Sequence, residues 1–152
     1  MSIDSREIEH RLQLFEQAIH EHGLKVTHQR IEIYREILDS DEHPDAEIMY
    51  QRVHERIPSI SRDTVYRTLG FLEKLGLVQR AELRSGPARY DADVQPHHHF
   101  VCTGCGLIVD IHSRKLDNIS APRNVEAIGK ISTSQVRFQG LCKQCEQKLS
   151  PK

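Results

Sequence analysis

Apolar residues recur at helical spacing through the first half of the chain, and typical helix-capping residues separate the runs. Residues 5–22 repeat apolar side chains at intervals of three and four, which predicts an amphipathic helix ending at Gly23. Three further helices are predicted to begin after the capping residues Thr27, Asp45 and Ser61. The residues expected to face inward, helix by helix, are Ile8, Leu12, Phe15 and Ile19; Ile31, Tyr34, Ile37 and Leu38; Ala46, Met49, Tyr50, Val53 and Ile57; and Val65, Leu69, Leu72 and Leu75.

After Gly76 the periodicity changes from that of helices to that of strands. Residues 77–83 and 88–93 are short strand-like runs joined by a turn signal at 85–87. Three helices followed by a two-stranded ribbon is the order of a winged helix, whose last helix enters the major groove of DNA. We therefore expect residues 1–90 to form a winged-helix DNA-binding domain with one extra helix in front.

The second half of the chain predicts a separate unit over residues 97–152, which a hinge at 91–96 connects to the first. The elements expected are strands at about 98–102 and 106–112, a helix within 113–127, a strand at about 130–139 and a short helix after Cys142. Such a mixture of helices and strands makes the whole chain α+β in class.

Charge is unevenly distributed along the chain. Residues 1–96 hold 13 lysines and arginines against 18 acidic residues, while residues 97–152 hold 8 against 4. An acidic first half lacks the broad basic surface of many DNA-binding domains, so DNA contact is expected to rest on a narrow stripe. No run approaches the roughly 18 apolar residues of a membrane span, and the N-terminus has no signal-peptide pattern. We expect a cytoplasmic protein with no membrane partner.

Four cysteines occur as two Cys-x-x-Cys pairs, and they carry the strongest chemical signal in the sequence. A short loop lets both sulfurs of a pair reach one ion, and four thiolates suit tetrahedral zinc. A closed site of four sulfurs keeps no open position, so it is expected to be structural and to contribute on the order of 10 kcal/mol to folding. The ligands predicted for this structural Zn²⁺ are Cys102, Cys105, Cys142 and Cys145.

Three histidines precede the first cysteine pair, and they predict a second metal site. Side chains alternate along a strand, so His97 and His99 share one face while His98 points away and is expected at the surface. Asp110 on the partner strand and Asp91 in the hinge could add carboxylates, and one of several upstream histidines could add an imidazole. A mixed nitrogen and oxygen set favours iron(II), manganese(II) or zinc(II). Spacing alone does not choose among His43, His28 and His54.

The fourth predicted helix is the candidate DNA-reading element. Its outward face offers an arginine and a tyrosine that could contact bases or phosphates, and arginines 80, 84 and 89 of the wing could add phosphate contacts. An ordinary solvated helix face is the alternative. The residues predicted to bind DNA are Arg62, Thr64, Tyr66 and Arg67.

Six stretches of the chain together resemble the ferric uptake regulator (Fur) family of bacterial metal-dependent repressors. They are GLKVTHQR at 23–30, EHPDAEIMY at 42–50, SRDTVYRTLGFLEKLGLV at 61–78, RYD at 89–91, HHHFVCTGCGLIVDI at 97–111 and LCKQC at 141–145. The resemblance implies a homodimer that binds palindromic double-stranded operator DNA, with residues 97–152 as the metal-binding dimerisation domain. It also implies a regulatory iron(II) or manganese(II) site at His43, Asp91, His97, His99 and Asp110.

The resemblance is strongest to the peroxide-sensing branch of that family. Both regulatory carboxylates are aspartates, and Pro96, Thr133 and Ser134 stand where the iron-sensing branch tends to carry histidines of an accessory site. It implies a repressor in which peroxide reacts at iron and oxidises a histidine ligand, His43 or His97, so that the DNA is released. An iron- or zinc-responsive homeostasis repressor of the same family is the alternative.

Two readings from other classes are disfavoured by the sequence. The paired signature of zinc deaminases is absent, and no nucleophile lies in an evident arrangement with a base, so an enzyme is not expected. A Cys-x-x-Cys redox protein remains a reading of the cysteines alone, and stably bound zinc would exclude it.

Overall fold

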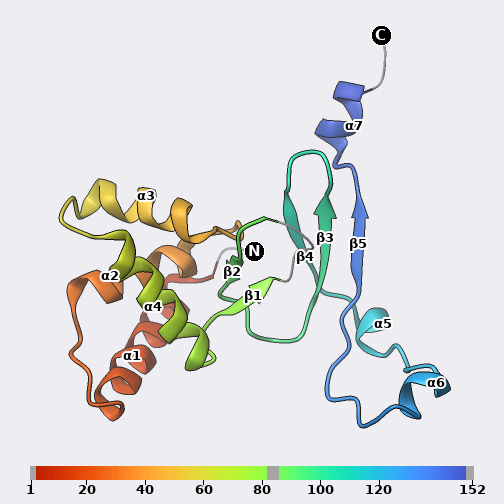
Figure 1. Ribbon diagram of the computed structural model, residues 1–152, viewed down its shortest axis with the longest axis horizontal. Coiled ribbons are helices and arrows are strands. Elements are labelled where there is room, and N and C mark those ends of the chain that lie inside the picture. The colour runs from red at the N-terminus through yellow and green to blue at the C-terminus, as the bar shows by residue number, and fades with distance from the viewer. Residues whose placement is uncertain (1–2, 82–85, 150–152) are drawn as a thin grey trace. The chain divides into compact units, whose positions relative to one another are not determined.

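The computed structural model describes residues 3–81 and 86–149, which form two compact units, Met1–Val94 and Gln95–Lys152 (Figure 1). The division after Val94 falls within the segment 91–96 that the sequence suggests as a hinge. Each unit is mixed in secondary structure, as expected for an α+β chain.

The first unit contains four helices followed by a two-stranded ribbon. Its elements are α1 (Ser5–Glu21), α2 (His28–Asp39), α3 (Ala46–Arg56), α4 (Arg62–Lys74), β1 (Gln79–Ala81) and β2 (Arg89–Asp91). The capping predictions for the last three helices are confirmed, because the side chains of Thr27, Asp45 and Ser61 each accept a hydrogen bond from a backbone N–H of the first turn. Asp4 caps α1 in the same way.

The core of the first unit is built from one apolar stripe of each helix. The stripe of α1 is the predicted one, whereas in α2 the residue that is fully buried is Ile33 and not Ile31. The buried stripe of α2 consists of two pairs of residues, Ile33 with Ile37 and Tyr34 with Leu38, and the members of each pair are about one helical turn apart. Ile31 lies at the edge of this stripe. Tyr50 is likewise only partly buried, and its ring instead lies under the guanidinium of Arg62.

The ribbon pairs β1 with β2 in antiparallel register, with Arg80 opposite Tyr90. Arg84 and the first residue of the predicted turn, Ser85, lie outside the described residues. The helices and ribbon therefore follow each other in the order expected for a winged helix, with α1 as the extra leading helix.

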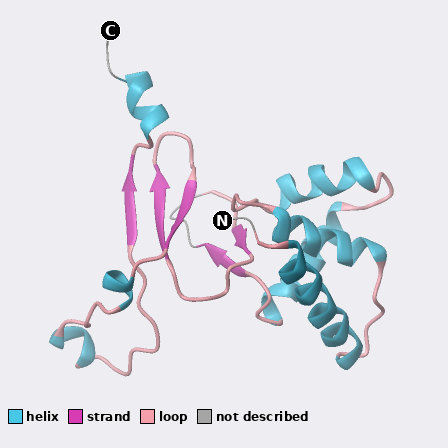
Figure 2. Ribbon diagram, turned by 180° about the vertical axis from the view of Figure 1, so that it is seen from behind, coloured by secondary structure: helices cyan, strands magenta, loops and turns pink. Residues whose placement is uncertain are grey.

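The second unit is built on a three-stranded sheet in which β3 (His98–Cys102) lies between β4 (Ile108–Ile111) and β5 (Arg137–Gly140) (Figure 2). Strand β3 pairs antiparallel with β4 and parallel with β5. The helices of this unit are α5 (Arg114–Asp117), α6 (Arg123–Glu126) and α7 (Lys143–Leu149).

Two predictions for this unit are wrong in extent. The single helix expected within 113–127 is two separate turns, α5 and α6, because Pro122 lies between them and cannot continue a helix that precedes it. The strand expected at about 130–139 forms only at β5, where it finds a partner in β3. Among the described residues no helix is long and apolar enough to span a membrane.

The pleat of this sheet separates two kinds of side chain. His99 is directly opposite Asp110, which puts these two polar groups on one face. Phe100 is opposite Val109 on one side and Phe138 on the other, which puts three apolar side chains on the reverse face. One strand thus supplies both a polar cluster and an apolar row.

Candidate functional site

The four cysteine sulfurs of the second unit converge on one point. All lie within 4.8 Å of one another, and Sγ of Cys105 is 3.8 Å from Sγ of Cys142. Sulfurs bound tetrahedrally to zinc at about 2.3 Å would be about 3.8 Å apart. None of the four is in a disulfide. The separation therefore matches that of four ligands around one zinc ion.

Two backbone contacts bring the cysteine pairs together from opposite ends of the unit. The N–H of Thr103, in the turn after β3, donates to the carbonyl of Gly140 at the end of β5 (2.8 Å). The N–H of Cys142 donates to Sγ of Cys102 (3.2 Å). These bonds make the parallel pairing of β3 and β5 continuous with the sulfur cluster.

Gly104 lies close to the sulfur cluster, which the spacing of the cysteines did not indicate. A Cβ placed on Gly104 would lie 3.0 Å from Sγ and 3.1 Å from Cβ of Cys145. Its hydrogen is thus what allows the second Cys-x-x-Cys segment to approach the first. A glycine inside a Cys-x-x-Cys segment was the available signal.

The sulfur cluster also has uneven acidity. Backbone N–H groups of the cluster, chiefly that of Cys142, donate to the sulfur of Cys102 and lower the pKa of that thiol to about 6. The neighbouring sulfurs of Cys142 and Cys105 raise the pKa of the Cys145 thiol to about 12. The Cys102 sulfur is therefore a thiolate at neutral pH, whereas the Cys145 thiol stays protonated unless a cation binds it.

Two imidazoles of the second unit converge on one carboxylate oxygen. Nε2 of His97 is 3.3 Å, and Nε2 of His99 is 3.4 Å, from Oδ1 of Asp110. Donors held at about 2.1 Å by one metal ion would be separated by about 3.0–3.4 Å, so these atoms stand where ligands of one ion would stand. Nδ1 of His97 donates to the carbonyl of Gln95 (2.7 Å), which leaves Nε2 as the nitrogen with a lone pair for a metal.

A similar pair of donors occurs in the first unit. Nε2 of His43 is 3.4 Å from Oδ2 of Asp91. The loop that carries His43 is attached to β2, because the N–H of Tyr90 donates to the carbonyl of Pro44 (2.9 Å) and the side chain of Arg89 donates to the carbonyl of His43. This attachment brings His43 beside Asp91, a contact that spacing could not predict.

His98 differs from the surface residue expected. It is almost fully buried, its Nε2 lies 3.0 Å from Oδ1 of Asp117, and its Nδ1 accepts the N–H of Val136 (3.0 Å). The prediction of a surface position for His98 was wrong because its partners, Asp117 and Val136, are distant in the sequence and no local pattern indicates them. His98 and Asp117 line a pocket of about 460 Å³, whose other lining residues are Pro96, Ile131, Ser132, Thr133 and Ser134. Those other residues supply no further imidazole or carboxylate.

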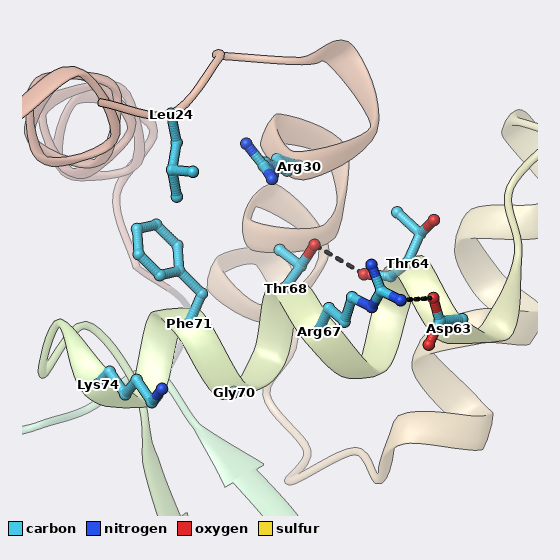
Figure 3. A pocket seen from close by; sticks show the side chains of 9 residues that line it. All are labelled: Leu24, Arg30, Asp63, Thr64, Arg67, Thr68, Gly70, Phe71 and Lys74. Atoms are coloured by element: carbon cyan, nitrogen blue, oxygen red, sulfur yellow. Dashed lines mark hydrogen bonds and ion pairs between the residues drawn. The ribbon is translucent and has the colours of Figure 1, made fainter. Parts of the chain in front are cut away.

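Helix α4 presents part of the predicted DNA-reading face to solvent. Tyr66 is 53% exposed, and the side chain of Arg67 is 81% exposed and forms an ion pair with Asp63 (3.0 Å) one turn earlier. A pocket of about 520 Å³ lies along this face, and Arg67, Arg30 and Lys74 bring positive charge to it (Figure 3). Thr64 also lines the pocket, and its N–H is bound by the capping Ser61.

Arg62 is engaged within the protein. Its guanidinium binds both oxygens of Glu47 (3.0 and 2.9 Å) and lies 4.2 Å from the centre of the Tyr50 ring. The hydrogen bond from Arg62 lowers the pKa of the Glu47 carboxyl. The Arg62 side chain is nevertheless 60% exposed, so it ties the start of α4 to α3 and still presents a charged group that could contact DNA.

Comparisons with known proteins agree with these features. A family model described as the ferric uptake regulator family matches residues 21–139. The peroxide-responsive repressor PerR of Staphylococcus saprophyticus is 30% identical over 148 residues, covering 97% of this chain and 100% of that protein. The Helicobacter pylori ferric uptake regulator, whose structure has three functional metal-binding sites, superposes with a TM-score of 0.79 at 26% identity and covers 94% of this chain and 96% of that one.

The Campylobacter jejuni peroxide stress regulator superposes with a TM-score of 0.66 at 32% identity, and the alignment covers 85% of this chain and 97% of that one. The enzyme reading is excluded, because proteins of the matched family are transcriptional regulators. The sulfur cluster fits structural zinc, and the histidine and aspartate donors fit a regulatory metal such as iron(II) or manganese(II). The chain belongs to the ferric uptake regulator family and is a metal-dependent regulator.

Proposed function

We propose that this chain is a transcriptional repressor that binds palindromic operator DNA as a homodimer and senses peroxide at its regulatory metal. The observation that carries the proposal is the convergence of His97 and His99 on one oxygen of Asp110. Neutral imidazoles and a carboxylate are the ligands that iron(II) and manganese(II) accept, and the sulfur cluster is chemically distinct from them.

The regulatory metal is proposed to join two sets of donors. His43 and Asp91 belong to the unit that carries α4, and the other three ligands belong to the unit that carries the sheet. A metal bound by both sets would favour one arrangement of the two units, and only the difference in its affinity between arrangements could shift that equilibrium. Structural zinc, held by Cys102, Cys105, Cys142 and Cys145, would act separately by stabilising the second unit.

Homodimer formation is supported by the apolar row on the reverse face of the sheet. Val109 and Phe138 are 44% and 45% exposed, and both lie beside Phe100. An exposed apolar row on a sheet is a typical protein-contact surface. A second copy of the chain is the proposed occupant, since a two-fold dimer matches the two-fold symmetry of a palindromic operator.

DNA binding is proposed through α4, with Tyr66 and Arg67 as its most exposed polar contacts and Thr64 beside them. In the major groove an arginine can bind guanine with two hydrogen bonds. Arg67 would exchange its ion pair with Asp63 for such a contact, and Arg62 would hold the start of the helix while it does so. We propose the cytoplasm, where the genomic DNA is, as the location that fits this role.

Peroxide sensing is supported by the identity of the carboxylates and by the relatives. Both regulatory carboxylates are aspartates, and peroxide-responsive repressors are among the chains that this one resembles over nearly its whole length. The proposed outcome is the transfer of one oxygen atom from peroxide to the imidazole of His43 or His97, while the other peroxide oxygen leaves as water. The imidazole supplies the two electrons that reduce peroxide overall, and iron(II), when bound, would supply the one-electron chemistry that activates the peroxide. An imidazole modified in this way is a poorer ligand, so the metal and the DNA would both be released.

Selection from random duplex DNA tests the repressor proposal. The zinc-loaded protein is incubated with the library in manganese(II) and, separately, in a chelator that leaves the zinc in place. We expect a palindromic sequence to be enriched only with manganese(II), on a protein that sediments as a dimer. Enrichment that ignores manganese(II), or none in either condition, would contradict the proposal.

A further inference from the structure

The leading helix α1 reaches the segment that carries a regulatory ligand. Nη1 of Arg11 donates to the carbonyl of Ala92 (2.6 Å), and Ala92 directly follows Asp91. Nε of the same guanidinium binds Oε1 of Glu7 (2.8 Å), one turn earlier on the helix. The Arg11 side chain is only 22% exposed. The arginine is therefore held in a fork between its own helix and the end of β2.

Tyr34 of α2 lies close enough to Arg11 for the positive charge of the guanidinium to affect the pKa of the phenol. Burial raises the pKa of the Tyr34 phenol to about 12, and the positive charge of Arg11 opposes that rise. The guanidinium of Arg11 therefore interacts with residues of α1, of α2 and of the segment that follows β2. Because it binds the carbonyl of Ala92, a shift of the guanidinium would also shift the backbone at Ala92.

The chain just after β2 is fastened at two further points. Nε2 of Gln79 donates to the carbonyl of Asp93 (2.5 Å), and the N–H of Asp93 donates to Oδ1 of Asp91 (2.8 Å). The second bond turns the other carboxylate oxygen, Oδ2, toward Nε2 of His43 at 3.4 Å. The orientation of the Asp91 carboxylate therefore depends on the backbone of residues 92 and 93.

We propose that Arg11 is a positioning residue for the regulatory metal, and that α1 orients the Asp91 carboxylate through the carbonyl of Ala92. This inference rests on the proposed function, because it assumes that Asp91 is a ligand. It gives the extra helix a role that a winged helix does not need for binding DNA: the helix holds a metal ligand in its binding geometry.

The test is manganese(II) binding to the full-length, zinc-loaded dimer, followed by electron paramagnetic resonance. Arg11→Met keeps a long apolar stem and removes both donors, and Arg6→Met removes an exposed arginine of the same helix as the matched control. Loss of a partner in the outer shell of a metal site typically weakens affinity by about 10–100-fold. Arg11 binds the Ala92 carbonyl and not the ligand itself, so we expect a loss at the lower end of that range, about tenfold, for Arg11→Met. We expect no change for Arg6→Met, and an altered cobalt(II) absorption spectrum only in the Arg11 variant.

The outcomes separate this inference from the proposed function. Wild-type affinity and an unchanged cobalt(II) spectrum in Arg11→Met, when Asp110→Ala no longer binds manganese(II), would overturn the inference alone. Failure of the wild-type protein to bind manganese(II) through Asp110 would overturn both. If Arg11→Met does not fold, Arg11→Gln, which is too short to reach Ala92, carries the same expectation and the same contradiction.

Discussion

Nε2 of His43 lies 3.4 Å from Oδ2 of Asp91, although His43 precedes α3 and Asp91 ends β2. The bonds from β2 to the loop, including that from Tyr90 to Pro44, hold the two side chains together within the first unit. In the second unit the Nε2 atoms of His97 and His99 lie 3.3 and 3.4 Å from Oδ1 of Asp110. The ligands proposed for the regulatory metal are thus arranged as one set of donors in each unit.

Removing the carboxylate that both histidines of the second unit face should abolish metal activation. We expect Asp110→Ala to lose manganese(II)-dependent operator binding, because His97 and His99 would lose the carboxylate that both face in their own unit. The zinc content and the dimer should stay unchanged, since the sulfur cluster is separate. Glu126→Gln removes an exposed carboxylate of the same unit and serves as the control. Manganese(II)-activated binding by Asp110→Ala would remove Asp110 from the site.

A methyl group at Gly104 should disturb the zinc cluster. The added Cβ would lie 3.0 Å from Sγ of Cys145, a distance at which the sulfur has to move. We expect Gly104→Ala to release zinc faster to a chelator and to unfold at a lower temperature. Gly129→Ala, where an added Cβ meets no atom within 4 Å, is the matched control. Equal zinc release from the two variants would show that the close approach is not needed.

Zinc binding should release a number of protons that depends on pH. Cys102, with its pKa lowered to about 6, is already a thiolate at pH 8, whereas the Cys145 thiol, with its pKa raised to about 12, is protonated there. Binding at pH 8 should therefore release at least one proton and fewer than four. As the pH falls through about 6, Cys102 becomes protonated, so one more proton must be displaced and the apparent affinity for zinc decreases.

Calorimetric titrations in buffers of different ionisation enthalpy measure this proton release. The same number of protons at pH 8 and pH 5 would contradict the assignment of Cys102 as the preformed thiolate. Cys102→Ser provides the comparison, because the pH-dependent proton should disappear with that sulfur.

The exposed face of α4 should determine operator affinity. We expect Arg67→Ala to weaken binding by about 1–3 kcal/mol if it contacts a base, and Tyr66→Ala with Arg67→Ala to weaken it further. Arg62→Ala should act mainly through stability, because that guanidinium binds Glu47 and stacks on Tyr50. Fluorescence anisotropy with the selected operator and thermal unfolding separate the two effects. Unchanged operator affinity in the double variant would exclude this face.

Local features of the fold follow from the sequence, whereas long-range partnerships do not. Capping residues and apolar spacing are local, and they predict the four helices of the first unit. Three residues expected to face inward, Ile31, Tyr50 and Leu75, are only partly buried, and in α2 the buried position is Ile33. The Cys-x-x-Cys pairs predict their own cluster because each pair is a complete half of a tetrahedral site. The single helix predicted within 113–127 does not form, because Pro122 separates α5 from α6.

The choice of His43 and the burial of His98 depend on partners from other elements. His43 is selected by backbone bonds to β2, and His98 by Asp117 and Val136. The hydrogen bond from Arg11 to the carbonyl of Ala92 could not be predicted from the sequence either, because the position of an arginine on an amphipathic helix does not indicate which distant carbonyl it binds. The resemblance to a family indicates His43 as a ligand, whereas the burial of His98 and the contact between Arg11 and Ala92 are seen only in the three-dimensional structure.

The most direct test of the central claim compares operator binding by the iron-loaded and manganese-loaded dimers before and after dilute peroxide, with peptide mass spectrometry on the same samples. We predict that only the iron form loses its DNA, and that the peptide containing His43 or the one containing His97 gains the mass of one oxygen atom. Operator binding that depends on metal but survives peroxide in both forms, with both peptides unmodified, would contradict peroxide sensing and indicate an iron- or zinc-responsive homeostasis repressor.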